Sequence, residues 1–138
     1  SALAMGADFA YIGTRFIASK EANAPKKYKE MLVSSSAKDI IYSSTFTGVH
    51  GNYLKPSIEK AGLDPLNLPQ SDKNDMNFGS SGLSGDNTKK AWKDIWGSGQ
   101  GIGTIADIPS VEECVDSLIE EYEFALNSLE ERTNLLGI

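Results

Sequence analysis

The hydrophobic and polar positions at the start of the chain follow the order of a helix end, a turn and a buried strand. Residues 1–5 favour a helix, and Gly6 suits the position after a helix end, where the backbone needs a positive φ. The apolar run 9–12 (Phe-Ala-Tyr-Ile) is typical of a buried parallel strand. Gly13 and Thr14 follow where this strand is expected to end. The pattern therefore predicts one short strand with a Gly-Thr pair at its end.

A helix and an extended segment are predicted next. Residues 21–33 are rich in helix formers, and their apolar side chains lie at Tyr28, Met31 and Leu32. The stretch 39–46 contains β-branched and aromatic residues, which favour an extended conformation. Pro25 suits the first turn of this helix.

The middle of the chain combines a short helix with a long polar loop. Asn52 is expected to cap a helix over 53–61, which Gly62 ends. Residues 64–88 are polar and glycine-rich, and a loop of this length is either functional or flexible. A further helix is predicted from about Thr88 to Trp96.

The last helix has the clearest signals. After the stretch 97–103, which is too rich in glycine for a regular element, Ser110 and Glu113 have the spacing of a capping box. Gly137 is expected to end the helix. Apolar residues recur every three or four positions, at Val111, Val115, Leu118, Tyr122, Ala125 and Leu129. These signals predict an amphipathic helix with an acidic outer face.

Composition narrows the classes of partner and compartment. The 138 residues carry a net charge of −6, which argues against nucleic acid or an anionic membrane surface as a partner. Cys114 is the single cysteine, so the chain has no intrachain disulfide. The sequence contains neither a signal peptide nor the ~20-residue apolar run of a membrane span, so we expect a cytoplasmic protein.

Few residues suggest chemistry by themselves. Gly13 and Thr14 could bind a phosphate through backbone N–H groups and the hydroxyl, but a Gly-Thr turn without a ligand is commoner. His50 is the single histidine, which excludes a two-histidine metal site within the chain. Cys114 fits a small buried hydrophobic residue better than a nucleophile.

Two tryptophans lie on one side of the helix predicted over 88–96. Trp92 and Trp96 are four residues apart and would normally anchor a core or an interface. Because a glycine-rich loop follows them, a pocket for a flat ligand is the alternative. Core packing is the simpler interpretation.

Taken in order, four segments of the chain resemble the nitronate monooxygenase family. The segments are residues 2–8 followed by Gly13-Thr14-Arg15-Phe16, residues 44–48, residues 52–58 with Gly62, and residues 96–103 followed by Asp107-Ile108-Pro109. Each segment is short, but the ordered set is fairly specific.

The resemblance implies an α/β fold, namely the C-terminal fragment of a (β/α)8 TIM barrel. Residues 1–36 would form the last βα unit, and residues 37–138 a mainly helical C-terminal extension with a flexible loop at 64–88. The catalytic histidine and the flavin-ring contacts of the family would precede residue 1. We therefore expect no catalytic residue in this chain, which corresponds to about the last third of such an enzyme. One strand cannot close a barrel by itself.

Members of this family oxidise alkyl nitronates with molecular oxygen and use noncovalently bound FMN. By position, Gly13 and Thr14 resemble part of the FMN phosphate site. Ser98, Gly99 and Gln100 resemble the loop that closes over the flavin. Arg15 matches a basic position near this site, where it either approaches the flavin or pairs structurally. The implied substrate is a nitronate or a similar small carbon acid, and no metal is implied.

Two alternatives stay open. Flavin-dependent enoyl-acyl-carrier-protein reductases share the barrel and the glycine-glutamine loop. The chain as it stands could also be a catalytically inactive helical fragment that binds FMN weakly or not at all. Such a fragment would form a homo-oligomer through the apolar stripe at 111–129, or pack against the missing N-terminal part.

Overall fold

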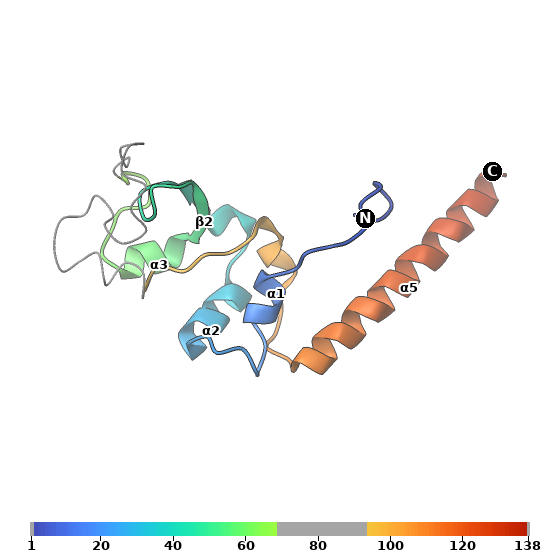
Figure 1. Ribbon diagram of the computed structural model, residues 1–138, viewed down its shortest axis with the longest axis horizontal. Helices are drawn as coiled ribbons and strands as arrows, with labels where there is room; N and C mark the ends of the chain where they lie inside the picture. The colour runs from blue at the N-terminus through green and yellow to red at the C-terminus, as the bar shows by residue number, and fades with distance from the viewer. Residues whose placement is uncertain (1, 69–93, 138) are drawn as a thin grey trace.

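A computed structural model describes residues 2–68 and 94–137 of the chain (Figure 1). The described residues form several short helices and a two-stranded sheet, and one long helix ends the chain. The elements in chain order are α1 (Thr14–Ile17), α2 (Lys26–Ser34), the 3₁₀ helix η1 (Ala37–Asp39), β1 (Ile40–Ser43), β2 (Gly51–Leu54), α3 (Lys55–Lys60), the 3₁₀ helix η2 (Gln100–Thr104) and α5 (Val111–Leu136).

The predicted helix end at the N-terminus is present as a hydrogen-bonded turn. Gly6 has a φ of +92°, and its N–H donates to the Leu3 carbonyl at 3.0 Å. The Ala7 N–H donates to the Ala2 carbonyl at 3.1 Å, so the pair of bonds forms a Schellman cap. Glycine is needed here because L side chains rarely adopt this conformation.

The strand predicted at residues 9–12 does not form in the single chain. These residues have no regular secondary structure, and Phe9 and Tyr11 are exposed. A strand requires a hydrogen-bonding neighbour. Within the described residues β1 and β2 pair only with each other and with Gly97, so residues 9–12 have no such neighbour.

Residues 39–46 contain the predicted extended segment, as strand β1 of an antiparallel hairpin. Ile40 lies opposite Leu54, and Ser43 lies opposite Gly51. The predicted role of Asn52 as a helix cap is wrong, because Asn52 lies within β2. Its carbonyl accepts a hydrogen bond from the Ser98 N–H at 3.2 Å, which fixes an extended backbone. Helix α3 therefore begins at Lys55.

The core consists of two adjoining clusters of buried apolar side chains. One contains Ala18, Leu32, Leu54, Ile102 and Ile105, and the other contains Phe46, Ile58 and Ile95. Burial of a leucine or isoleucine side chain contributes about 1.5–3 kcal/mol. Because Leu32 and Ile102 are fully buried, the first cluster joins α2 to η2 across the sequence.

The glycine-rich stretch 97–103 is more regular than predicted. Gly97 forms a bridge to Tyr53, and residues 100–104 form η2. Ordering glycines costs conformational entropy. Burial of the Ile102 side chain offsets part of this cost. Most of the predicted loop 64–88 and of the helix predicted at 88–96 lies outside the described residues.

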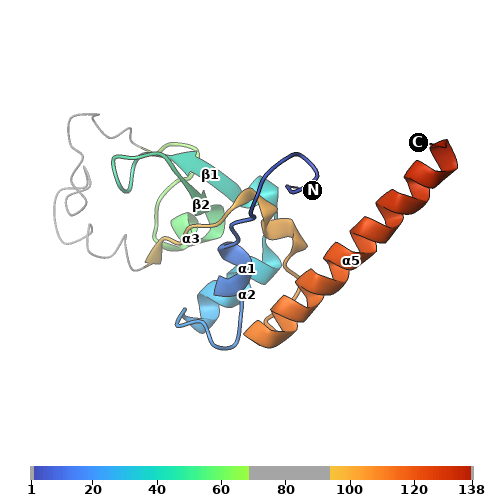
Figure 2. The ribbon, with the colours of Figure 1, turned by 45° about the vertical axis from the view of Figure 1, so that its right-hand side comes forward.

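Helix α5 has the predicted caps and extends away from the rest of the molecule (Figures 1 and 2). Ser110 and Glu113 form the capping box, and Gly137 has a φ of +68°. The first turns contact the body, and Cys114 is buried there, as predicted. Most of the apolar stripe is exposed in the single chain, including Tyr122 and Leu129. No helix in the described part of the chain is both long enough and apolar enough to span a membrane.

Candidate functional site

A hydrogen bond between Thr14 and Gly99 brings together the residues that the sequence singled out. The Gly99 N–H donates to Thr14 Oγ1 at 2.9 Å, although the two residues are 85 positions apart. Gly13 precedes Thr14 as the N-cap of α1, and Gln100 follows Gly99 as the first residue of η2. All four predicted cofactor-binding residues therefore belong to one small region.

The region carries hydrogen-bond donors, and its backbone is open to approach at Gly13. Because Thr14 Oγ1 accepts from Gly99, the proton of the hydroxyl is left to donate to another group. The first N–H groups of a helix have no acceptor within the helix, and in α1 these include the N–H of Thr14. A Cβ placed on Gly13 would have no heavy atom within 4 Å, so a ligand could approach its backbone.

The segment 96–98 holds Gly99 in place by pairing with β2. The Leu54 N–H donates to the Trp96 carbonyl at 2.8 Å, and the Ser98 N–H donates to the Asn52 carbonyl at 3.2 Å. These two bonds flank the bridge between Tyr53 and Gly97, so residues 96–98 run antiparallel beside β2.

Trp96 packs into the body, as the simpler interpretation of the tryptophans predicted. Its ring stacks on Tyr28 with centroids 4.9 Å apart, and its backbone N–H donates to Ser57 Oγ at 3.0 Å. Trp92 lies outside the described residues. The predicted pairing of the two rings on one helix face therefore cannot be placed, and Trp96 itself is not helical.

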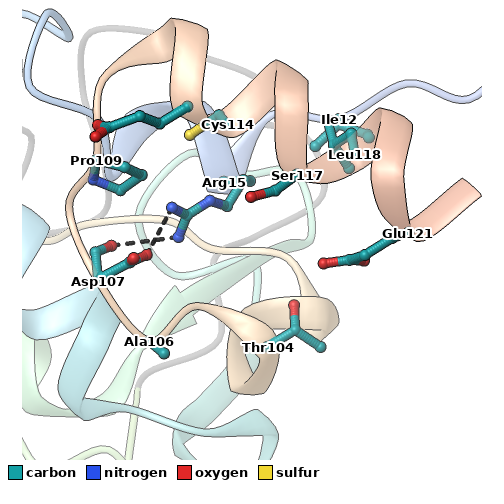
Figure 3. A pocket seen from close by; sticks show the side chains of 11 residues that line it. Ile12, Arg15, Thr104, Ala106, Asp107, Pro109, Cys114, Ser117, Leu118 and Glu121 are labelled. Carbon is teal, nitrogen blue, oxygen red and sulfur yellow. Dashed lines mark hydrogen bonds and ion pairs between the residues drawn. The ribbon is translucent and has the colours of Figure 1, made fainter.

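Arg15 pairs with Asp107 on the side of α1 that faces the linker to α5 (Figure 3). Arg15 Nη2 is 2.8 Å from Asp107 Oδ1, and Nη1 donates to the Asp107 carbonyl at 3.2 Å. The pair lies in a groove of about 500 Å³ that is also lined by Ile12, Cys114 and Leu118. Arg15 thus attaches α1 to the segment before α5. Of the two roles predicted for Arg15, this is the structural pairing.

Sequence reasoning missed Lys29, which ties α2 to the turn after α1. The side chain is 8% exposed, and Nζ donates to the carbonyls of Ser19 at 2.6 Å and Lys20 at 3.2 Å. The available signal was weak: Lys29 lies three positions before the buried Leu32 and so shares its side of the helix.

The same turn caps α5. Lys20 Nζ is 3.1 Å from Glu113 Oε2, and the Val111 N–H donates to Glu21 Oε2 at 3.0 Å. The backbone N–H and side chain of Ser110, together with Lys20, lower the pKa of Glu113 from 4.5 to about 2. A turn near the predicted site therefore fixes the start of the last helix.

The single histidine and the single cysteine make no contact with Thr14 or Gly99 that would suggest a chemical role. His50 stacks on Tyr42 with centroids 4.9 Å apart, and Cys114 is a buried residue in the first turns of α5. Among residues 2–68 and 94–137, no group of three or more His, Cys, Asp or Glu side chains could hold a metal ion.

Comparisons with known proteins agree with the resemblance seen in the sequence. No relative was found among curated protein sequences. Two solved structures of FabK from Thermotoga maritima, one of them a point mutant, superpose with a TM-score of 0.62 each. Their sequences are 22% and 21% identical to this chain and cover 94% of it. The chain spans 38% and 42% of those two structures, and it therefore shares the fold of a part of them.

The family comparison covers most of the chain. The model of the family described as nitronate monooxygenase matches residues 1–121. This range includes both halves of the Thr14–Gly99 contact and the start of α5. Because the match extends over more than half of its length, the chain belongs to the nitronate monooxygenase family.

Proposed function

We propose that this chain is the C-terminal part of an FMN-dependent oxidoreductase and contributes to the binding of the FMN phosphate. The observation that carries the proposal is the hydrogen bond from the Gly99 N–H to Thr14 Oγ1. It brings together two segments to which the family resemblance independently assigns cofactor contacts. Membership of the nitronate monooxygenase family supports the same assignment.

The donor set near Thr14 fits a phosphate group. The Thr14 hydroxyl and the N–H groups at the start of α1 are hydrogen-bond donors, and the backbone at Gly13 is open to approach. Arg15 is occupied by Asp107, so these neutral donors would hold the phosphate. Gln100, next to Gly99, would lie at the edge of the bound cofactor. The fit is between the donors near Thr14 and the phosphate group of FMN.

The chemistry that we propose for the whole protein is oxidation of an alkyl nitronate by molecular oxygen. When bound, FMN supplies the capacity to accept electrons from the anionic carbon acid. The role of this chain's own residues is to bind and orient the cofactor. The whole protein would provide the base and the contacts to the flavin ring from residues outside this chain.

Purification of the protein from its intact reading frame tests the proposal. We expect a yellow protein with one FMN per chain and oxygen consumption that depends on a nitronate. A colourless product without bound FMN would contradict the proposal. The 138 residues alone should turn over no nitronate and bind FMN weakly, and tight stoichiometric binding would contradict this second expectation.

A flavin-dependent enoyl-acyl-carrier-protein reductase is the alternative activity, since such enzymes share the glycine-glutamine loop. The same preparation separates the two activities. NADH oxidation with an enoyl thioester, and no oxygen uptake with a nitronate, would favour the reductase.

The exposed stripe of α5 supports a second, non-catalytic role for the isolated chain. Tyr122 and Leu129 are about half exposed, and both lie on the stripe. We propose that the isolated chain self-associates through this stripe, because burial of these side chains against a second copy removes apolar surface from water.

A further inference from the structure

Tyr28 connects α2 directly to the glycine-rich segment that carries Gly99. Its hydroxyl donates a hydrogen bond to the Gly97 carbonyl, 69 positions away in the sequence. In Figure 1 this segment crosses the body of the molecule from the side of α3 to α1. Tyr28 therefore acts on the segment two residues before Gly99.

The Gly97 carbonyl is available to Tyr28 because of the way the segment pairs with β2. The two bonds of this pairing join Leu54 to Trp96 and Ser98 to Asn52. Gly97 lies between them, opposite Tyr53, in the type of antiparallel pair that exchanges no hydrogen bonds of its own. Its carbonyl is therefore directed away from β2.

Aromatic packing fixes the position of the Tyr28 ring. The ring stacks on Trp96 with an angle of 20° between the two planes. Lys60 Nζ lies 5.5 Å from the centroid of the Trp96 ring, in a cation–π contact. Burial raises the pKa of the Tyr28 hydroxyl above its ordinary value of 10.0, so the group stays a donor at neutral pH.

A side chain at position 97 would disturb this arrangement. A Cβ on Gly97 would lie 3.3 Å from the Asn52 carbonyl oxygen, closer than most Cβ atoms approach an oxygen. The glycine therefore permits the close approach to β2, while Tyr28 supplies the hydrogen bond on the other side.

We propose that Tyr28 is a positioning residue for the phosphate site, which sets the path of residues 97–99 so that the Gly99 N–H meets Thr14 Oγ1. The inference rests on the proposed function, because the site that Tyr28 serves is the FMN phosphate site. Tyr28 itself touches neither the substrate nor the reacting atoms. Its effect is transmitted through Gly97 and Gly99.

The test compares the whole protein with its Tyr28→Phe variant, which keeps the stack on Trp96 and loses the hydroxyl. We expect the Kd for FMN to rise about fivefold, as for the loss of one neutral hydrogen bond, with kcat at saturating FMN within about twofold. Tyr42→Phe is the matched control, because Tyr42 is 69% exposed and its ring stacks on His50 instead. This control should bind FMN as the wild type does.

Two further measurements separate positioning from general stability. Hydrogen exchange at the Gly99 amide, measured without FMN, should be faster in Tyr28→Phe and unchanged in Tyr42→Phe. In a Thr14→Val background, which lacks the acceptor for Gly99, the effect of Tyr28→Phe on FMN binding should largely disappear.

Additive effects of the two substitutions, or unchanged Gly99 exchange, would overturn the positioning role. If the wild type binds no FMN, the proposed function fails. The Gly99 exchange measurement then decides by itself whether Tyr28 holds the segment in place.

Discussion

At the scale of single residues, Thr14 is the most informative position in the molecule. Its hydroxyl oxygen accepts a hydrogen bond from the Gly99 N–H, and its proton can still be donated. One side chain therefore both joins α1 to the glycine-rich segment and offers a donor to a ligand. Arg15 beside it has a different task, since its guanidinium pairs with Asp107. Thr14 thus belongs to the proposed cofactor site, whereas Arg15 attaches α1 to the linker that precedes α5.

Substitution of Thr14 tests the proposed phosphate contact. In the whole protein, Thr14→Val should raise the Kd for FMN about 10- to 100-fold, since hydrogen bonds to charged groups contribute about 1.5–3 kcal/mol. Fluorescence titration of FMN measures the change. Thr14→Ser, which keeps the hydroxyl, should bind nearly as the wild type does.

Thr133→Val serves as the control for Thr14→Val. The Thr133 hydroxyl donates within α5 to the Glu130 carbonyl, far along the sequence from Gly99. An equal loss of FMN affinity in Thr14→Val and Thr133→Val would contradict a phosphate contact at Thr14.

At the scale of elements, the start of α5 is fixed by local and distant groups together. Ser110 and Glu113 form the capping box that their spacing predicts. Lys20 and Glu21 add contacts from a turn about 90 residues earlier, which the spacing could not reveal. The helix is therefore a local feature, whereas its attachment to the body is a tertiary one.

The pKa of Glu113 predicts how this attachment depends on pH. Because the folded value is about 2 and the ordinary value is 4.5, the ionised carboxylate stabilises the folded state above about pH 4.5. This contribution is lost as the pH falls from 4.5 towards 2. Glu113→Gln should therefore lower the Tm at pH 7, and the difference from the wild type should shrink at acidic pH.

Thermal unfolding followed by circular dichroism between pH 7 and pH 2 measures this effect. Glu120→Gln is the control, since Glu120 is exposed on the same helix. A difference for Glu113→Gln that stays constant over this pH range would show that the carboxylate does not act through its charge.

At the scale of the whole molecule, two apolar parts of the chain lie outside the core. Phe9 and Tyr11 are exposed in the segment predicted to be a strand, and the stripe of α5 is exposed as well. The chain spans about two fifths of the FabK structures whose fold it shares in part. Both surfaces are available to pack against further protein.

Self-association of the isolated chain tests the role of the stripe. Tyr122→Glu combined with Leu129→Glu places two charges on the stripe, and we expect sedimentation to show a shift towards monomer. Asn127→Glu combined with Asn134→Glu has the same spacing off the stripe and should leave the oligomer unchanged. A wild-type chain that is monomeric at all concentrations would contradict the proposal.

The sequence by itself determined the features whose causes lie within a few residues. The cap at Gly6, the capping box at Ser110, the end of α5 at Gly137 and the extended segment at β1 follow from local backbone and hydrogen-bond preferences. The resemblance likewise identified Gly13, Thr14, Gly99 and Gln100 as one set without any measure of their separation.

Only the tertiary structure decided the features that depend on distant partners. Residues 9–12 have strand-like composition, but no described residue pairs with them, so the strand is absent. Asn52 looks like a cap and lies in a strand, because the hairpin and Ser98 determine its backbone. The contact of Thr14 with Gly99 spans 85 positions, and it exists because Tyr28 and β2 hold the glycine segment against α1. Local patterns carry no information about such contacts, since the energy that forms them comes from groups far apart in the chain.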